Sequence, residues 1–420
     1  MPRRLLARLL LTAVAVVALA APSLAADADS AVLFIGDGMG PVQIQMTRAA
    51  AGGDRLAMEK LPFSGFATTI NVEGKTTDSA AAGTALATGR KTNNGVIGLA
   101  PDGERLTTVL ERAKAEGKAT GIITTDSLWG ATPASFAAHA RNRGMSAEIA
   151  AQMAACGAEV MMGFWKDQML PTSAGGKRTD GRDLIAEMQQ AGYQIVYTKD
   201  ELKAAQGRKL VGLFEDGATA PSISDMVSAA LQRLSENPKG FFLIVEGARC
   251  DWFSHDNDPA GAVLATLELD AAVATAAGFA RECGRTLVVV TADHETGGPV
   301  VADGSKLGGL SGVKLSSEEM AGKLSPARDN VGEVLRLGAG IGDVTAAEAD
   351  SVRTAESPSS GIAAVISART GLTWTTGSHT ANRVRVFAFG PGAQQFSGDL
   401  DNTDIPKRIA DSIGVGPLGN

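Results

Sequence analysis

Short apolar runs alternate with longer amphipathic segments along most of the chain. The runs lack strict apolar–polar alternation, which is typical of strands buried on both faces of a sheet. Strands are predicted at 31–36, 119–124, 159–163, 241–245, 286–291 and 384–389. Helices are predicted at 79–88, 106–116, 133–142, 146–155, 182–191, 222–235, 260–282 and 404–412. This succession predicts an α/β fold with a mostly parallel central sheet and helices on both faces.

The segment 303–375 interrupts this rhythm. It is rich in Gly, Ser and Ala and contains no strong strand pattern. We expect a surface insertion with two or three short helices, carried by a single α/β domain that spans 26–420. A separate domain is the alternative, although about 70 residues with few large apolar side chains would make a thin core.

Residues 1–25 predict a secretory signal peptide. Arg3, Arg4 and Arg8 precede the apolar run LLLTAVAVVALAA, and Ser23-Leu24-Ala25 provides a small-x-small cleavage signal. The apolar run is shorter than the ~20 residues that a membrane-spanning helix needs, and we expect no later segment to span a membrane. The mature protein is therefore expected in the periplasm or secreted into the medium.

The charge balance argues against nucleic acid as a dedicated partner. The net charge is −7, and without the three arginines of the leader 36 basic residues face 46 acidic ones. Binding a phosphate backbone needs clustered Lys and Arg. The cysteines, Cys156, Cys250 and Cys283, are odd in number and form no C-x-x-C pair. We expect at most one disulfide and no thiolate metal site.

Only four histidines occur in the 420 residues, and two of them stand beside carboxylates in patterns that suit a metal site. Asp251 and His255 are four residues apart, which on a helical turn places both on one face. Asp293 and His294 are adjacent, and they can share a metal only where the strand ends and the backbone turns. Imidazole and carboxylate groups are characteristic zinc ligands.

Three more carboxylates, Asp37, Asp126 and Glu246, each follow a predicted strand. In open α/β sheets, ligands bind at the carboxyl ends of the strands, so these side chains are expected at one edge. His379, in TTGSHT, has no metal-site pattern of its own. It is a candidate ligand only because a further ligand from elsewhere would complete a site with Asp251 and His255. His139 lies in a predicted helix and is expected to be structural.

A candidate nucleophile lies in TDSAAAGTALATG. Asp78 suits a helix N-cap, which puts Ser79 in the first turn, where N–H groups and the helix dipole favour anions. No G-x-S-x-G motif occurs, so activation by a metal is favoured over a serine–histidine triad. Arg143, expected to close the helix 133–142, suits bidentate binding of phosphoryl oxygens. Thr132 and Glu246 offer hard oxygen donors suited to magnesium.

Six motifs, in this order, resemble the alkaline phosphatase family: IGDGMG, TDSAAAGTALATG with KTNNGVIG, ATPASFAAHARNR, VEGARCDWFSH, VTADHETGG and TTGSHTANRVRVFAFG. The resemblance covers about 31–300 and resumes near 374–392, and the insertion falls in a region that varies within the family. It implies hydrolysis of small-molecule phosphate monoesters through a phosphoserine, with two zinc ions and one magnesium ion. Family members are often dimers, so a homodimer is compatible with the resemblance.

The resemblance also implies a role for each matching position. Ser79 matches the nucleophile and Arg143 the phosphate-binding arginine. One zinc would be held by Asp37, Asp293 and His294, the other by Asp251, His255 and His379, and the magnesium by Asp37, Thr132 and Glu246.

Two positions depart from the family pattern. Gly130 stands where members usually carry Asp or His beside the magnesium, so we expect a weaker or more water-coordinated magnesium site. Trp252 stands where some members carry Lys or His near the substrate, so this chain lacks that cation.

Two other functions stay open on the sequence alone. A related phosphodiesterase or sulfatase would share the two-metal core, although Arg143 suits a dianionic monoester and no C-x-P-x-R segment supplies a sulfatase cysteine. A periplasmic phosphate- or metal-binding protein without catalysis is the other alternative, and it would have no need of an activated Ser79.

Overall fold

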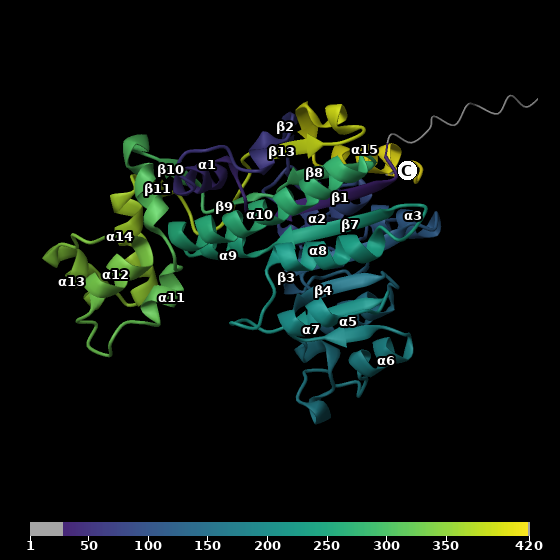
Figure 1. Ribbon diagram of the computed structural model, residues 1–420, viewed down its shortest axis with the longest axis horizontal. Helices are drawn as coiled ribbons and strands as arrows, with labels where there is room; N and C mark the ends of the chain where they lie inside the picture. The colour runs from purple at the N-terminus through teal and green to yellow at the C-terminus, as the bar shows by residue number, and fades with distance from the viewer. Residues whose placement is uncertain (1–27, 419–420) are drawn as a thin grey trace, which may run out of the picture.

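A ten-stranded sheet forms the centre of the computed structural model, which describes residues 28–418 (Figure 1). The predicted signal peptide lies outside the described residues. The strand order is β14-β2-β13-β8-β1-β7-β3-β4-β6-β5. β13 runs antiparallel to both of its neighbours, and every other neighbouring pair is parallel. The strands are β1 (Ser30–Gly36), β2 (Phe63–Thr68), β3 (Ala119–Ser127), β4 (Val160–Phe164), β5 (Gln194–Val196), β6 (Leu210–Phe214), β7 (Phe241–Gly247), β8 (Thr286–Thr291), β13 (Val384–Phe389) and β14 (Gly398–Asp401).

Helices flank this sheet (Figure 1). α8 and α10 pack against each other and on the central strands, while α2, α3 and α15 form a second group that also contacts the sheet through α3. The helices outside the segment 303–375 are α1 (Pro41–Ala50), α2 (Ser79–Thr88), α3 (Val109–Ala115), α4 (Ala131–Ala134), α5 (Ser146–Ala155), α6 (Leu184–Gln190), α7 (Lys199–Ala204), α8 (Ile223–Leu234), α9 (Arg249–His255), α10 (Pro259–Cys283) and α15 (Asp404–Ser412). The predicted fold class is confirmed.

All six predicted strands are present in the ten-stranded sheet, whose other four strands, β2, β5, β6 and β14, the sequence interpretation missed. β5 and β14 form the two edges of the sheet and are only three and four residues long. β6 is buried but short, and Gly212 interrupts its apolar side chains. Edge strands and short strands bury few side chains, so the apolar pattern that reveals central strands is weak in them.

The helix predicted at 133–142 is wrong. α4 ends at Ala134, and the following residues turn so that Ala140 pairs with Ile97 in an isolated antiparallel bridge. Thr108 Oγ1 donates to the carbonyl oxygen of Phe136 at 2.7 Å. The alanine-rich sequence favours a helix locally, but tertiary partners take its backbone groups instead. Arg143 therefore follows a loop rather than closing a helix.

α10 is long and apolar enough to cross a membrane by length and composition alone, which the sequence interpretation overlooked. In the fold it contacts β1, β7 and β8 and packs on α8 and α9. Its side chains Val263, Leu269 and Val273 are buried. Its apolar composition therefore serves the core of this face of the sheet.

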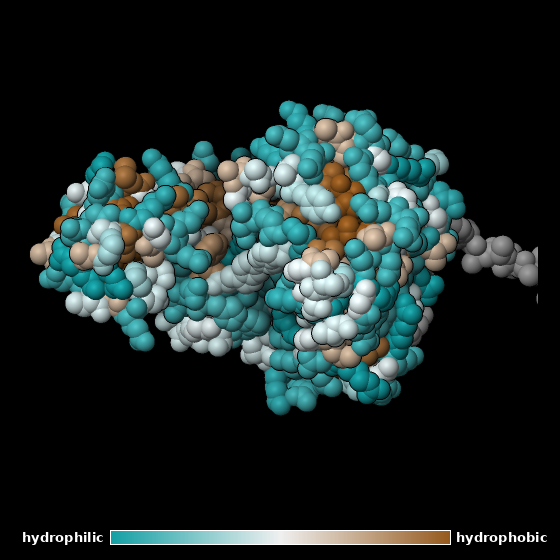
Figure 2. Space-filling model, turned by 90° about the horizontal axis from the view of Figure 1, so that it is seen from below, coloured by the Kyte–Doolittle hydropathy of each residue, from teal (hydrophilic) through white to brown (hydrophobic). Residues whose placement is uncertain are grey.

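The segment 303–375 contains more helix than expected. Its elements are the 3-10 helix η4 (Gly304–Gly312), α11 (Ser317–Ala321), α12 (Val331–Ala339), α13 (Ala346–Thr354), α14 (Pro358–Arg369) and the strand β11 (Leu372–Trp374). These helices bury side chains such as Leu310, Val331, Leu335 and Ile362. β10 (Pro299–Val301) pairs with β11, which ties the two ends of the segment together. The helices form a lobe to one side of the sheet (Figures 1 and 2).

All three cysteines lie within the described residues, and all three are free thiols. Cys250 is buried next to the metal-ligand candidate Asp251, and burial raises its pKa to about 12. No disulfide joins these three cysteines within the chain.

Asp258 joins α10 to the lobe, and its removal should weaken both. Its side chain caps α10 through Ala260 N at 3.0 Å and accepts from Ser317 N and Oγ at 2.8 and 2.7 Å. We predict that Asp258→Ala lowers the free energy of unfolding by about 2–3 kcal/mol, since it removes a cap and leaves buried donors unpaired. Urea denaturation measures this loss. Asp258→Asn keeps one acceptor oxygen and should lose less; equal losses would contradict this account.

Candidate active site

The carboxyl ends of three neighbouring strands bring the predicted acidic residues to one edge of the sheet. β1 lies between β7 and β8, with Ile35 in register with Glu246 on one side and Thr291 on the other. Asp37 follows β1 directly, and Asp293 lies two residues beyond the end of β8. The candidate site therefore sits where ligands bind in open parallel sheets.

Asp37, Asp293 and His294 form the first cluster of possible metal ligands, with one ligand atom from each lying within 4.8 Å of the others. His294 Nε2 lies 3.4 Å from Asp37 Oδ1 and 3.2 Å from Asp293 Oδ2. All three residues are buried. Gly38 lets the chain approach this closely, because its φ is +69° and a Cβ would lie 2.7 Å from Asp251 Cα.

The hydrogen bonds of Thr296 determine which nitrogen of His294 is free. The Thr296 hydroxyl donates its proton to Asp251 Oδ1, so its oxygen accepts from His294 Nδ1 at 3.2 Å. His294 Nε2 then carries a lone pair, and burial with neighbouring His379 lowers the pKa of His294 to about 3. A neutral imidazole lone pair aimed at two carboxylates is repulsive unless a cation lies between them.

Asp251, His255 and His379 form the second cluster of possible ligands, again within 4.8 Å. α9 places Asp251 and His255 on one face, with His255 Nε2 3.3 Å from Asp251 Oδ2. His379 reaches them because β12 (His379–Thr380) pairs with β9 (Glu295–Thr296), opposite Thr296. His379 Nε2 lies 3.1 Å from His255 Nε2 and 3.6 Å from Asp251 Oδ1.

Backbone carbonyls orient both histidines of the second cluster. His255 Nδ1 donates to the carbonyl of Gly377 at 2.7 Å, and His379 Nδ1 donates to that of Thr77 at 3.0 Å. The Nε2 atoms are thereby left to face each other and Asp251. The hydrogen bond with Asp251 raises the pKa of His255 to about 9, so a proton holds the group together where no cation is bound.

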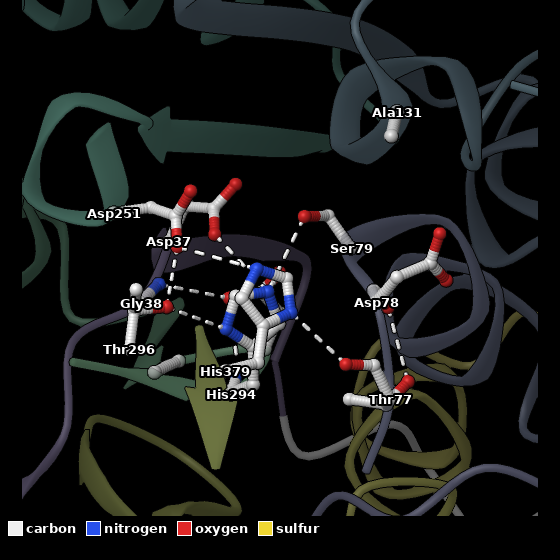
Figure 3. A network of polar contacts seen from close by, with 12 residues as sticks. Asp37, Gly38, Thr77, Asp78, Ser79, Ala131, Asp251, His294, Thr296 and His379 are labelled. Carbon is white, nitrogen blue, oxygen red and sulfur yellow. Dashed lines mark hydrogen bonds and ion pairs between the residues drawn. The ribbon is translucent and has the colours of Figure 1, made fainter. Parts of the chain in front are cut away.

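The two clusters adjoin each other. The rings of His294 and His379 stack with centroids 3.6 Å apart and planes inclined by 22°. In Figure 3, Asp37, Asp251, His294 and His379 converge on one space from different elements, and Ser79 points toward it from the opposite side.

Ser79 is the first residue of α2 and lies next to the first cluster. Its Oγ is 3.3 Å from His294 Nε2, and the side chain is buried. Asp78 caps the helix through Ala81 N at 3.0 Å, as predicted. Arg143 Nη1 donates to Asp78 Oδ2 at 3.4 Å, so the residue before Ser79 tethers the exposed guanidinium.

Glu246 extends the acidic region: its charge acts on Asp37, and the side chain of Thr132 acts on Glu246 in turn. Burial raises the pKa of Glu246 to about 8, with a further contribution from the charge of Asp126. Thr124 Oγ1 donates to Glu246 Oε2. Thr132 Oγ1 is buried and forms no well-aligned hydrogen bond among the described residues, although it lies near enough to Glu246 to lower the pKa of that carboxyl.

The charges and unpaired atoms of the site fit divalent cations. Asp37 Oδ1 and Asp293 Oδ2 are buried without hydrogen-bond donors in the part of the chain that the structure describes. Burial, together with other carboxylates, raises the pKa of Asp37 well above its usual value and that of Asp293 to about 7. Carboxylate oxygens and imidazole nitrogens that lack donors and converge within a few ångströms are a coherent cation-binding set.

Every predicted site residue lies in this region, and three supporting residues were missed. Asp78 was proposed only as a cap, yet it also tethers Arg143. Thr296 connects the two clusters and Thr124 supports Glu246, and nothing in their local sequence marks either. His139 is away from the clusters: it binds the carbonyl of Gly98 at 2.7 Å and Glu111 at 3.2 Å, as a structural residue does.

Comparisons with known proteins identify clear relatives. The family model described as "Alkaline phosphatase" matches residues 28–415. Alkaline phosphatase 4 of Bacillus subtilis (strain 168) is 38% identical, with 90% of this chain and 87% of the relative covered. The cold-active alkaline phosphatase of the psychrophile Shewanella sp. superposes with a TM-score of 0.82 at 31% identity, covering 91% of this chain and 99% of that one. A point variant of TAB5 alkaline phosphatase, solved with Mg bound in its M3 site, gives 0.70 at 27% identity, covering 94% and 99%.

Removal of metal should make stability fall with pH. The native stripped protein keeps protons on Glu246, with a pKa of about 8, and on His255, with a pKa of about 9. The unfolded chain releases both by about pH 6.5, so the native state binds more protons and loses stability as the pH rises to about 9. We predict a melting temperature that falls between these pH values. The metal-loaded protein should show a smaller fall, since cations replace the protons.

Two variants identify the groups responsible. Glu246→Gln and His255→Gln should each reduce the slope of melting temperature against pH in the stripped protein. A stripped protein that is as stable at pH 9 as at pH 6.5 would contradict the assigned protonation.

Proposed function

The chain belongs to the alkaline phosphatase family of phosphate-monoester hydrolases, and from this premise we propose that it works through a phosphoserine at Ser79. The substrates would be small-molecule phosphate monoesters, and the products an alcohol and inorganic phosphate. The observation that carries the proposal is the position of Ser79 Oγ, 3.3 Å from His294 Nε2 at the N-terminus of α2. A hydroxyl there lies beside the first ligand cluster, and Asp78, the residue before it, tethers Arg143.

Two zinc ions and one magnesium ion suit the donor sets. The first zinc would be held by Asp37, Asp293 and His294, the second by Asp251, His255 and His379, and the magnesium by Asp37, Thr132 and Glu246. When bound, such ions supply Lewis-acid stabilisation of the charge on the attacking and leaving oxygens. The magnesium part draws support from the unpaired Thr132 Oγ1 and from the TAB5 variant with Mg in its M3 site.

In the first step, Ser79 Oγ gives up its proton to solvent and attacks the phosphorus atom. The new O–P bond forms while the bond to the alcohol oxygen breaks, and the leaving alkoxide takes a proton back from solvent, so that a neutral alcohol departs. Arg143 binds two phosphoryl oxygens, and the N-terminal N–H groups of α2 attract the same anion. Asp78 orients Arg143 for this contact, because it fixes one end of the guanidinium.

In the second step, water attacks the phosphoserine. The bond between Ser79 Oγ and phosphorus breaks, inorganic phosphate leaves, and a proton of the attacking water passes to Ser79 Oγ, which restores the starting state. His294 lies beside Oγ throughout and stays neutral, because burial disfavours its charged form. The first cluster is buried, whereas His255 of the second cluster is exposed to solvent. Water would therefore reach the phosphoserine from the side of the second cluster.

The predicted leader, 1–25, supports export, so the mature enzyme would act in the periplasm or the medium. A homodimer stays an expectation from the resemblance to the family.

The substitution Ser79→Ala tests the mechanism. We predict that the parent protein hydrolyses p-nitrophenyl phosphate at alkaline pH and loses this activity with a chelator, and that zinc restores it. The parent should take label from radioactive phosphate at mildly acidic pH, and Ser79→Ala should take none, because the only proposed acceptor oxygen is gone.

Zinc content provides the control, since Ser79→Ala keeps every ligand and should bind as much zinc as the parent. Label on another residue of the variant would rule out the phosphoserine. Faster turnover of bis-p-nitrophenyl phosphate than of the monoester would favour the phosphodiesterase instead.

Arg143 should contribute to binding and to the transition state through its two-pronged contact. We predict that Arg143→Ala lowers kcat/KM for a monoester by about 10²–10³, as loss of a preorganised donor does. Arg143→Lys keeps the positive charge but loses the bidentate geometry of the guanidinium, so its kcat/KM should lie between those of the parent and Arg143→Ala. The inhibition constant of inorganic phosphate should rise in parallel. Unchanged phosphate inhibition in Arg143→Ala would remove this arginine from the site.

A further inference from the structure

Gly130 has no side chain, yet the space beside it is filled. It precedes α4, close to the buried, unpaired hydroxyl of Thr132. A Cβ built on Gly130 would meet Asp126 Oδ2 more closely than real Cβ atoms approach anything, and Asp126 Cγ at 3.0 Å. The carboxylate of Asp126 therefore takes the place in which a side chain at position 130 would begin.

An irregularity at the end of β3 turns Asp126 toward this place. The pairing of β3 with β4 shifts register between Ile123 and Ser127. Asp126 N donates to Thr124 Oγ1 at 2.8 Å, and Ser127 N donates to Asp126 Oδ1 at 2.5 Å. The carboxylate is thus held at one oxygen, and the other faces Gly130.

Asp126 is also connected to Glu246, one of the proposed magnesium ligands. The hydroxyl of Thr124 accepts from Asp126 N and donates to Glu246 Oε2, which links the two acids through one side chain. The negative charge of Asp126 helps to raise the pKa of Glu246, and the positive charge of Arg143 acts to lower the pKa of Asp126. Glu246 is buried and Asp126 is half-buried, so their like charges repel each other, and a divalent cation near both would remove the repulsion.

A second observation points to a ligand at this place. Asp37 Oδ1 and Thr132 Oγ1 are both buried, with side chains of which less than a tenth is exposed. Among residues 28–418 neither forms a well-aligned hydrogen bond, although Thr132 lies near enough to Glu246 to lower its pKa. An unpaired buried hydroxyl and an unpaired buried carboxylate oxygen are the donors that a hard cation with bound water takes up.

We propose that Asp126 supplies the carboxylate that position 130 lacks, and that it holds the water shell of a magnesium ion bound by Asp37, Thr132 and Glu246. This inference rests on the magnesium site of the proposed function. It replaces the expectation of a weak site drawn from Gly130 alone: the acid is present, but it comes from the strand end instead of the helix start.

Calorimetric titration of magnesium into protein loaded with two zinc ions tests the role of Asp126. We expect Asp126→Asn and Asp126→Ala to weaken magnesium binding by about tenfold or more, as loss of a partner to a metal's water does. Asp54 is exposed and distant from Asp126 in the sequence, so Asp54→Asn should leave the magnesium affinity at the parent value. Zinc content and melting temperature show whether each variant is folded.

Transferring the carboxylate from position 126 to position 130 tests whether magnesium binding needs the acid at this place in the site, whichever residue supplies it. In Gly130→Asp alone, two acids compete for one space, so magnesium binding should not improve. In the double variant Asp126→Ala with Gly130→Asp, the acid is restored from the other side, and most of the lost affinity should return. Parent-like binding in Asp126→Ala, or no recovery in the double variant, would overturn the proposal.

The outcome also distinguishes this inference from the proposed function. Parent protein that takes phosphate label on Ser79 with zinc but binds no magnesium would overturn the inference and leave the phosphoserine mechanism standing. Failure of labelling with intact, Asp126-dependent magnesium binding would do the reverse.

Discussion

Four carboxylates, from Asp37, Glu246, Asp251 and Asp293, are buried together at one edge of the sheet, and their mutual repulsion governs the site. Each buried negative charge costs several kcal/mol unless it is paired, and here hydrogen-bond donors satisfy only part of the oxygens. Burial is the largest reason that the pKa values of Asp293 and Glu246 rise to about 7 and 8, and neighbouring carboxylate charges add to the rise, so protons can offset part of this cost. Divalent cations relieve it more fully, so the fold carries stored electrostatic energy that metal binding releases.

The supporting hydrogen bonds convert this repulsion into a specific site. The Nδ1–H groups of His255 and His379 donate hydrogen bonds to the carbonyls of Gly377 and Thr77. The Nδ1–H group of His294 donates to the hydroxyl oxygen of Thr296. Each imidazole therefore presents Nε2 to the carboxylates without choosing between tautomers at the moment of binding. The sheet contributes by placing β1 between β7 and β8, since this order alone brings Asp37 next to both Glu246 and Asp293.

Much of this arrangement could be predicted from local sequence, and the exceptions have physical reasons. The spacing of Asp251 and His255 indicated a helical turn, and α9 supplies it. His379 carries no such signal, because a two-residue ladder with Thr296 brings it in from a distant segment. The prediction of a helix before Arg143 was wrong, because Ala140 pairs with Ile97 and this tertiary contact overrides the helix propensity of an alanine-rich segment. Asp126 was noted only as following a strand; its orientation toward Gly130 depends on a register shift that no pattern reveals.

The most direct test of the account is a crystal structure of the zinc-loaded protein with anomalous data collected at the zinc edge. The account predicts two strong peaks about 4 Å apart, as in two-metal sites. One would be contacted by Asp37, Asp293 and His294, the other by Asp251, His255 and His379, with Ser79 Oγ beside the first. Peaks at other side chains, or Ser79 turned away from both, would contradict it.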